Sequence, residues 1–223
     1  IKELADKAFA GFWWLEEVEF SEGLQSIGKE CFNECSGLSK ISLPGSLKYI
    51  GESCFSECRY LKEIQLSNNL KSLPDRCFLH CYELESIALP SSVISLGANC
   101  FERCFNLKSA GDLSYVQKIG NSCFSQCDEF EGPLKLENIK SLGEYCFYEC
   151  KKIREIMGLP KLEFLGKGCF YSCSRLSGDI TLPVELKEIP EECFYKCERL
   201  NSINFSKDLT SFGDRSFLGT GIE

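Results

Sequence analysis

One short motif, Cys-Phe-x-x-Cys, recurs along the whole chain and contains all 16 of its cysteines. The first cysteine of each copy follows the previous one by 23 residues, except for an interval of 24 between Cys169 and Cys193. Ala8-Phe9 and Ser216-Phe217 continue the same frame toward the two ends. A period of this length, kept over the whole chain, predicts a solenoid of stacked repeats. The cysteine pairs are Cys31/Cys35, Cys54/Cys58, Cys77/Cys81, Cys100/Cys104, Cys123/Cys127, Cys146/Cys150, Cys169/Cys173 and Cys193/Cys197.

The full unit reads C-F-x-x-C-x-x-L-x-x-I-x-L-P-x-x-L-x-x-I-G-x-x, as in residues 31–53. The segment Leu38-x-x-Ile41-x-Leu43 ends in alternation, which predicts a short strand with Ile and Leu facing inward. From Gly51 through Cys58 the apolar residues have helical spacing, so we expect a short helix or tight turn there. Acidic residues such as Asp75 follow directly after the Gly or Pro. They would lie near the positively polarised N-terminus of such a helix, where a negative charge is stabilising.

The fold predicted from this unit is α/β, with a short parallel strand and a short helix or turn in each repeat. One unit cannot enclose a core, whereas stacked units bury each other's apolar faces. We expect one array over residues 1–223, with about nine repeats of 23 residues. Ile1 and Leu4 fit the last part of one unit and Gly221-Ile222 the start of another, which predicts truncation within a repeat at both ends.

This unit resembles the BspA-like, or Treponema-type, leucine-rich repeats, over essentially the whole chain. It departs from many members by having Cys where they have Ala before the Phe, as in Cys31-Phe32, a variant similar to members from parasitic protists. The resemblance implies a leucine-rich repeat solenoid. It also implies a cell-surface protein that binds extracellular matrix, host cells or other microbes, although a fold alone does not fix a function.

The cysteines allow three interpretations. A zinc site is one, but the Cys-x3-Cys spacing differs from the usual zinc knuckle. A disulfide ladder is another, but equivalent cysteines of stacked units would have parallel Cβ vectors, which disfavours a bridge. The third is that the thiols are small buried hydrophobes. Other residues replace the cysteines in the same frame, namely Ala8 and Phe12 in the first unit and Ser216 and Thr220 in the last. Metal ligands or disulfide partners could not be replaced in this way, so the pattern favours a structural core role.

Charge and composition restrict the partners. The net charge of −8 argues against a nucleic-acid partner, because phosphate binding requires a basic face. No apolar run approaches the roughly 20 residues that a membrane span needs, so we expect no membrane insertion within this chain. The chain begins at Ile1 without a leader, which leaves open an anchor or signal outside it.

Nothing in the sequence indicates catalysis, a cofactor or a metal site. The single histidine, His80, occupies a position filled elsewhere by residues such as Glu34 and Lys196, so we expect it on the surface. No Ser-His-Asp or Cys-His arrangement recurs, and no phosphate-binding loop is present. We therefore expect a protein that is not an enzyme.

Two aromatic features are candidates for contacts with a partner. Tyr148, Tyr171 and Tyr195 occupy equivalent positions in three successive units, where earlier units have residues such as Asn33 and Ser56. Stacked tyrosines would form an exposed interface stripe or would pack only on each other. The segment Phe12-Trp13-Trp14 replaces polar pairs of later units, which predicts an N-terminal cap or a contact site.

The outward positions of the strand face are mixed in charge and indicate no particular ligand. They include Glu17, Lys40 and Glu63, which we expect to pair across neighbouring strands. Glycines interrupt this face in four units, at Gly111, Gly132, Gly158 and Gly178. They predict either a change in curvature, which we favour, or a reshaped site.

Taken together, these features favour a surface-exposed, non-enzymatic protein-binding module for adhesion or host contact. An intracellular interaction scaffold, or a structural component of a larger assembly, is the alternative.

Overall fold

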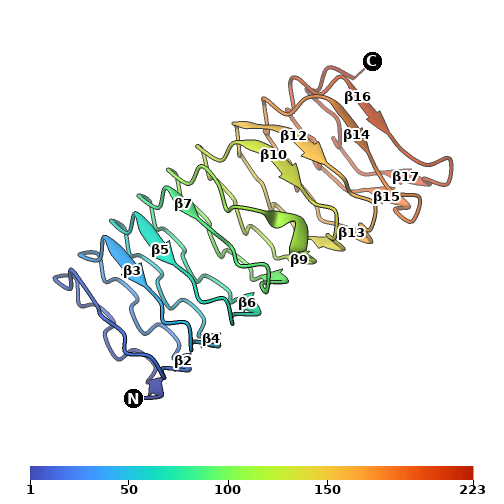
Figure 1. Ribbon diagram of the computed structural model, residues 1–223. Helices are drawn as coiled ribbons and strands as arrows, with labels where there is room; N and C mark the ends of the chain where they lie inside the picture. The colour runs from blue at the N-terminus through green and yellow to red at the C-terminus, as the bar shows by residue number, and fades with distance from the viewer. Residues whose placement is uncertain (223) are drawn as a thin grey trace.

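In the computed structural model, which describes residues 1–222, the chain winds into a parallel β-solenoid with its two ends at opposite poles (Figure 1). Each turn has three sides. Two carry short parallel strands, and the third carries the Cys-Phe-x-x-Cys segment, which we call the turn face. Residues one period apart therefore lie side by side along the solenoid, as the pairing of Lys40 with Glu63 and of Ser72 with Ser95 shows.

The first strand face is formed by the Leu-x-x-Ile-x-Leu segments. Its strands are β3 (Lys40–Ser42), β5 (Glu63–Gln65), β7 (Ser86–Ile87), β10 (Gly132–Lys135), β12 (Ile153–Met157), β14 (Asp179–Thr181) and β16 (Ser202–Asn204). The predicted strand at residues 38–43 is confirmed, because β3 has Ile41 buried and Lys40 and Ser42 exposed.

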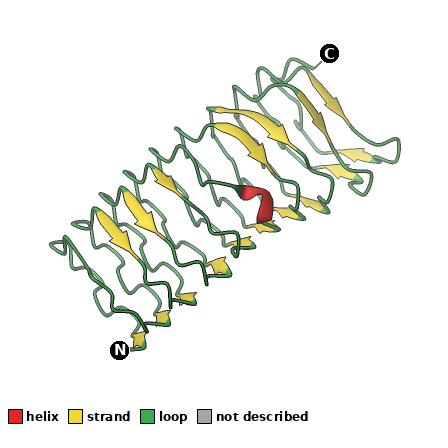
Figure 2. Cartoon of the chain, in the orientation of Figure 1, coloured by secondary structure: helices red, strands yellow, loops and turns green. Residues whose placement is uncertain are grey.

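A second column of strands lies where the unit reads x-x-Ile-Gly, and the sequence did not predict it (Figure 2). These strands define the second strand face. They are β1 (Glu3–Leu4), β2 (Ser26–Ile27), β4 (Tyr49–Ile50), β6 (Ser72–Leu73), β8 (Ser95–Leu96), β9 (Lys118–Ile119), β11 (Ser141–Leu142), β13 (Phe164–Leu165), β15 (Glu188–Ile189) and β17 (Ser211–Phe212).

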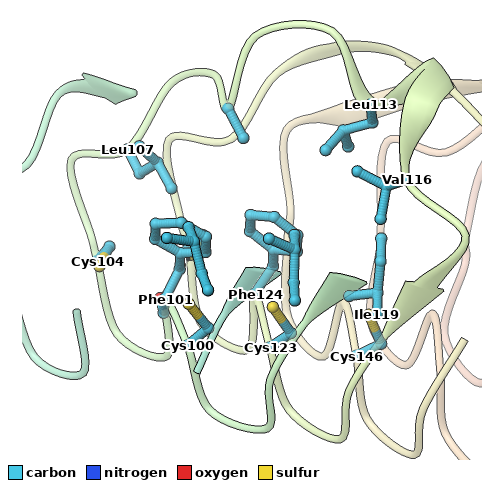
Figure 3. Close-up of a cluster of buried hydrophobic side chains, with 14 of the residues drawn as sticks. Cys100, Phe101, Cys104, Leu107, Leu113, Val116, Ile119, Cys123, Phe124 and Cys146 are labelled. Carbon is cyan, nitrogen blue, oxygen red and sulfur yellow. Dashed lines mark hydrogen bonds between the residues drawn. The ribbon is translucent and has the colours of Figure 1, made fainter. Parts of the chain in front are cut away.

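The phenylalanines of the motif form a continuous stack through the core. Successive rings from Phe9 to Phe217 lie with centroids 5.1 to 5.6 Å apart and almost parallel. Figure 3 shows Phe101 and Phe124 in this arrangement, with Leu107, Val116 and Ile119 around them. The rings from Phe32 to Phe194 are completely buried, so in these turns the Phe makes the largest apolar contribution to the core.

The predicted helix on the opposite side of the repeat is wrong, and the alternative of a tight turn is what the structure has. Within residues 1–222 there is no α-helix, and one 3-10 turn, η1 (Leu113–Tyr115), lies outside the cysteine motif. In the motif, residues such as Glu30 and Glu34 have φ of 53° and 61°, which an α-helix does not allow. The backbone instead bonds to the next turn, as when the Phe32 amide donates to the Cys54 carbonyl at 2.8 Å.

The acidic residues predicted near a helix N-terminus have a different role. The Asp75 carboxylate accepts a hydrogen bond from the backbone amide of Ala98, one turn further on, at 2.7 Å. Asp6 accepts from the amide of Lys29 in the same way, also at 2.7 Å. These side chains therefore tie neighbouring turns together.

Glycines interrupt the first strand face at the four expected places. Gly111, Gly132, Gly158 and Gly178 all have positive φ, between 74° and 93°. The register of β10 and β12 shifts between Gly132 and Pro133, which is the bulge that glycine favours. The ladder on this face consequently divides into a β3-β5-β7 group and the pairs β10-β12 and β14-β16.

Candidate binding surfaces

All 16 cysteines are free and buried, so the structure places them in the core, as the frame of the repeat indicated. The second cysteine of each turn donates from Sγ to the Phe carbonyl of the previous turn, for example Cys81 to Phe55 at 3.1 Å. Burial raises the pKa of the Cys31 and Cys35 thiols to about 11, and raises that of deeper thiols such as Cys58 and Cys81 further. Thiols held neutral in this way are poor nucleophiles.

The predicted tyrosine stripe lies on the turn face as a stack of half-buried rings. The centroids of Tyr148 and Tyr171 are 4.9 Å apart, and those of Tyr171 and Tyr195 are 4.6 Å apart. Partial burial raises the pKa of the Tyr148 and Tyr171 hydroxyls, so both stay protonated and can donate hydrogen bonds. The Lys196 ammonium lies 5.3 Å from the centre of the Tyr195 ring.

A fourth tyrosine, which the sequence analysis missed, joins this stack. The Tyr145 ring meets Tyr148 edge-on, with centroids 5.8 Å apart. It occupies the space over Gly168, where a Cβ would lie 2.3 Å from the ring. The signal was present in the sequence, because Gly168 is the glycine one period after Tyr145. We name Tyr145, Tyr148, Tyr171 and Tyr195 the tyrosine patch.

The aromatic segment of the first turn forms an exposed cluster at the N-terminal pole. Phe12 stacks on Trp14 with centroids 5.1 Å apart, and Trp13 meets Trp14 edge-on at 5.5 Å. Trp13 and Trp14 are 67% and 58% exposed. Phe12 also lies edge-on against Phe9, the first ring of the core stack, at 5.9 Å.

The first strand face has exposed polar residues that bond to their neighbours in the next strand. Lys40 pairs with Glu63 at 2.8 Å, as expected, and the Ser42 hydroxyl donates to Gln65 at 3.1 Å. A shallow hollow of about 790 Å³ lies at the N-terminal end of this face and includes Glu17 and Glu19. Its mixed charges still indicate no particular ligand.

His80 differs from the surface position expected for it, because it is half-buried. Its Nδ1 lies 2.5 Å from the Glu57 carboxylate, and Arg59 contacts the same carboxylate at 3.0 Å. The imidazole also lies 5.7 Å from the Tyr82 ring. These contacts fix the side chain within the turn face.

Residues 1–222 have neither a candidate metal site nor a candidate membrane-spanning helix. No group of three or more His, Cys, Asp or Glu side chains there is arranged to hold a metal ion. In that same part of the chain, no helix has the length and apolarity needed to cross a membrane.

Short parallel strands, a 23-residue period and a leucine-lined core define a leucine-rich repeat solenoid. The chain belongs to the family described as BspA type leucine rich repeat region, whose model matches six copies over residues 2–131 and 117–223. The predicted family is thus confirmed. A comparison with curated proteins finds no match.

Solved structures of bacterial leucine-rich repeat proteins share this fold. A protein from Bacteroides ovatus is 24% identical, with a TM-score of 0.57 over 98% of this chain and 68% of its own. A protein from Eubacterium ventriosum is 19% identical, with a TM-score of 0.58 over 100% of this chain and 75% of its own. Identities this low show the fold alone.

Proposed function

We propose that this chain is a non-enzymatic protein-binding scaffold and that the tyrosine patch is its contact surface. The observation that carries the proposal is the stack of Tyr148, Tyr171 and Tyr195 on the turn face, with centroids 4.9 and 4.6 Å apart. Equivalent positions in other turns have residues such as Asn33 and Ser125, so the fold does not require an aromatic ring there.

The geometry of the patch suits a protein partner. Because the rings stack on each other, they are held rigid, and little side-chain entropy remains to be lost on binding. Their outer edges and hydroxyls offer apolar area together with hydrogen-bond donors, the combination enriched at interface hot spots. The neighbouring Lys196 adds a positive charge at the edge of the patch.

We place this function at the cell surface or outside the cell, with a protein of the extracellular matrix or of a host surface as the partner. The support is the family resemblance of the repeat, whose known representatives are largely surface proteins. The alternative is an intracellular scaffold or a structural component of a larger assembly. The observation that favours it is the set of 16 free thiols, since secreted proteins rich in cysteine usually form disulfides.

Binding to purified matrix proteins tests the proposal. Wild-type protein should bind at least one of immobilised fibronectin, laminin and collagen saturably in biolayer interferometry. The triple variant Tyr148→Ser, Tyr171→Ser, Tyr195→Ser introduces the residue that Ser56 and Ser125 already supply at this position, so we expect it to fold. It should lose about tenfold or more in affinity.

The matched control replaces three exposed tyrosines elsewhere, Tyr49, Tyr60 and Tyr115, by serine. Equal losses in both variants, or an unchanged affinity in the triple variant, would remove the patch from the interface. Failure of the wild-type protein to bind any of the matrix proteins would contradict the proposed partner class. Antibody labelling of intact against permeabilised cells separates the two locations.

For Phe12, Trp13 and Trp14 we propose a cap. The contact of Phe12 with Phe9 supports it, because this edge covers part of the first ring of the core stack.

A further inference from the structure

Between β4 and β11 the second strand face has an excess of exposed lysines, although the protein as a whole is acidic. Lys118 is exposed in β9, and Lys48, Lys71 and Lys140 are exposed immediately before β4, β6 and β11, so that the four lie within five successive turns. Parallel strands stack about 4.8 Å apart, so these ammonium groups extend over roughly 20 Å of the solenoid axis. We name these four residues the lysine row.

The lysine row lacks ion pairs, whereas eight of the other 14 lysines within residues 1–222 have one. These eight pair with an acid one turn away, as Lys7 does with Glu30 at 3.1 Å and Lys29 with Glu52 at 2.8 Å. Within residues 1–222, none of the four has a carboxylate within 4.0 Å, even though Glu163 lies one turn from Lys140. Four unpaired charges in two adjacent columns along the solenoid attract a linear polyanion.

The neighbours of the lysine row supply hydroxyls and exposed rings. Ser72 and Ser95 pair in register between the lysines, and Ser95 pairs in turn with Lys118. Tyr49 and Phe164 lie near the two ends of the row and are 59% and 52% exposed. A partner with many hydroxyls, apolar ring faces and spaced negative charges would match all three kinds of side chain.

Two other classes of polyanion fit less well. Duplex DNA carries a negative charge every 1.7 Å or so, far denser than this row, and the net charge of −8 would repel it. An acidic peptide gains affinity by adding a strand to an open sheet edge. This is the face of a sheet, where backbone groups pair with the neighbouring turns, as the Gly120 amide does with the Leu96 carbonyl at 2.9 Å.

The geometry points to a binding site for an acidic polysaccharide along the second strand face, with the lysine row contacting its anionic groups. The lysine ammonium is a point charge on a flexible stem, so it can contact sulfate or carboxylate groups whose positions vary along a polysaccharide. The site lies on a different side of each turn from the tyrosine patch, so its occupancy does not depend on the proposed protein partner.

Heparin, a sulfated polysaccharide, is the probe that tests this site. We expect the wild-type protein to bind immobilised heparin at low salt and to be released as salt rises. The variant Lys48→Ser, Lys71→Ser, Lys118→Ser, Lys140→Ser should bind about tenfold more weakly or worse. All four positions are exposed, so circular dichroism and the melting temperature should stay unchanged.

The matched control, Lys29→Ser, Lys40→Ser, Lys108→Ser, Lys151→Ser, changes the net charge equally but lies on other faces, and it should keep most of the affinity. Absence of heparin binding by the wild-type protein would overturn the inference, as would equal losses in both variants. Polyglutamate and duplex DNA serve as competitors. If either displaced heparin at equal charge concentration, the assignment to a polysaccharide would be wrong.

Discussion

The Sγ of Cys104 donates a hydrogen bond to the backbone carbonyl of Phe78, in the previous turn, at 3.2 Å. The same bond recurs in every turn that has the motif, so the second cysteine column joins neighbouring turns as well as filling space. The first column differs, since Cys100 faces Cys123 of the next turn (Figure 3). Two cysteines with equal burial therefore have different partners.

This difference predicts unequal costs for the same substitution. Cys104→Ser should be tolerated better than Cys100→Ser, because a hydroxyl at position 104 keeps the Phe78 carbonyl as acceptor. At position 100 a buried hydroxyl would have only the weak sulfur acceptor of Cys123, so the substitution should cost about 1–3 kcal/mol. Urea unfolding of both variants gives the comparison.

Cys104→Ala is the control for the hydrogen bond itself. It removes the donor and leaves a small cavity, so it should be less stable than Cys104→Ser. If Cys100→Ser and Cys104→Ser had the same free energy of unfolding, the carbonyl contact would have no energetic importance.

The buried thiols also predict unfolding at alkaline pH. Burial raises the pKa of the Cys31 and Cys35 thiols from 9.0 to about 11. Because the folded state holds these protons to higher pH than the unfolded chain does, the stability they contribute is complete below about pH 9. It is lost as pH rises toward the folded values, at about 1.4 kcal/mol per pH unit for each such thiol.

Melting temperatures measured by circular dichroism at a series of pH values should therefore fall steeply above about pH 9. The double variant Cys31→Ser, Cys35→Ser should show a shallower fall than the wild-type protein. A melting temperature that stayed constant from pH 8 to 11 or so would contradict the link between thiol burial and stability.

Much of this fold follows from the period of the sequence, and the part that does not has an identifiable physical cause. The inward Ile41 and the polar residues beside it predicted β3 correctly. The second strand column has only one inward residue per strand, as in Ser72-Leu73, too few to show an alternation. Cysteines at i and i+4 suit both a helix and a turn, and the left-handed residues that decide between them, such as Glu30, are not glycines.

Of the candidate site, too, one part could be predicted from the sequence and another could not. Tyr148, Tyr171 and Tyr195 share one column and were found by comparing units. Tyr145 belongs to another column, and its contact with them depends on the space over Gly168. A contact of this kind between columns requires the three-dimensional arrangement of the turn.

Gly168 and Tyr145 should be coupled energetically. Gly168→Ala puts a Cβ where the Tyr145 ring lies and places alanine at φ 57°, so it should displace the ring and cost about 1–2 kcal/mol. In a Tyr145→Ser background, part of that cost should disappear, because the ring is no longer there. A double-mutant cycle by chemical denaturation measures the coupling. Additive effects of the two substitutions would show that the ring does not occupy this space.

Ser122 provides a test of the turn conformation, since it is a half-buried residue with a φ of 51°. Asn99 occupies the equivalent position one turn earlier with φ 56°, so Ser122→Asn is the matched control and should be close to neutral. Ser122→Val should cost about 1–2 kcal/mol, because a β-branched residue fits the left-handed region poorly. Ser122→Gly should cost less than Ser122→Val, because glycine adopts positive φ freely.

In a helix the order of the two variants would be reversed, since glycine in a helix interior is about 0.5 kcal/mol less stable than valine. The sign of the difference between these two variants in urea unfolding therefore distinguishes a turn from a helix at the cysteine motif.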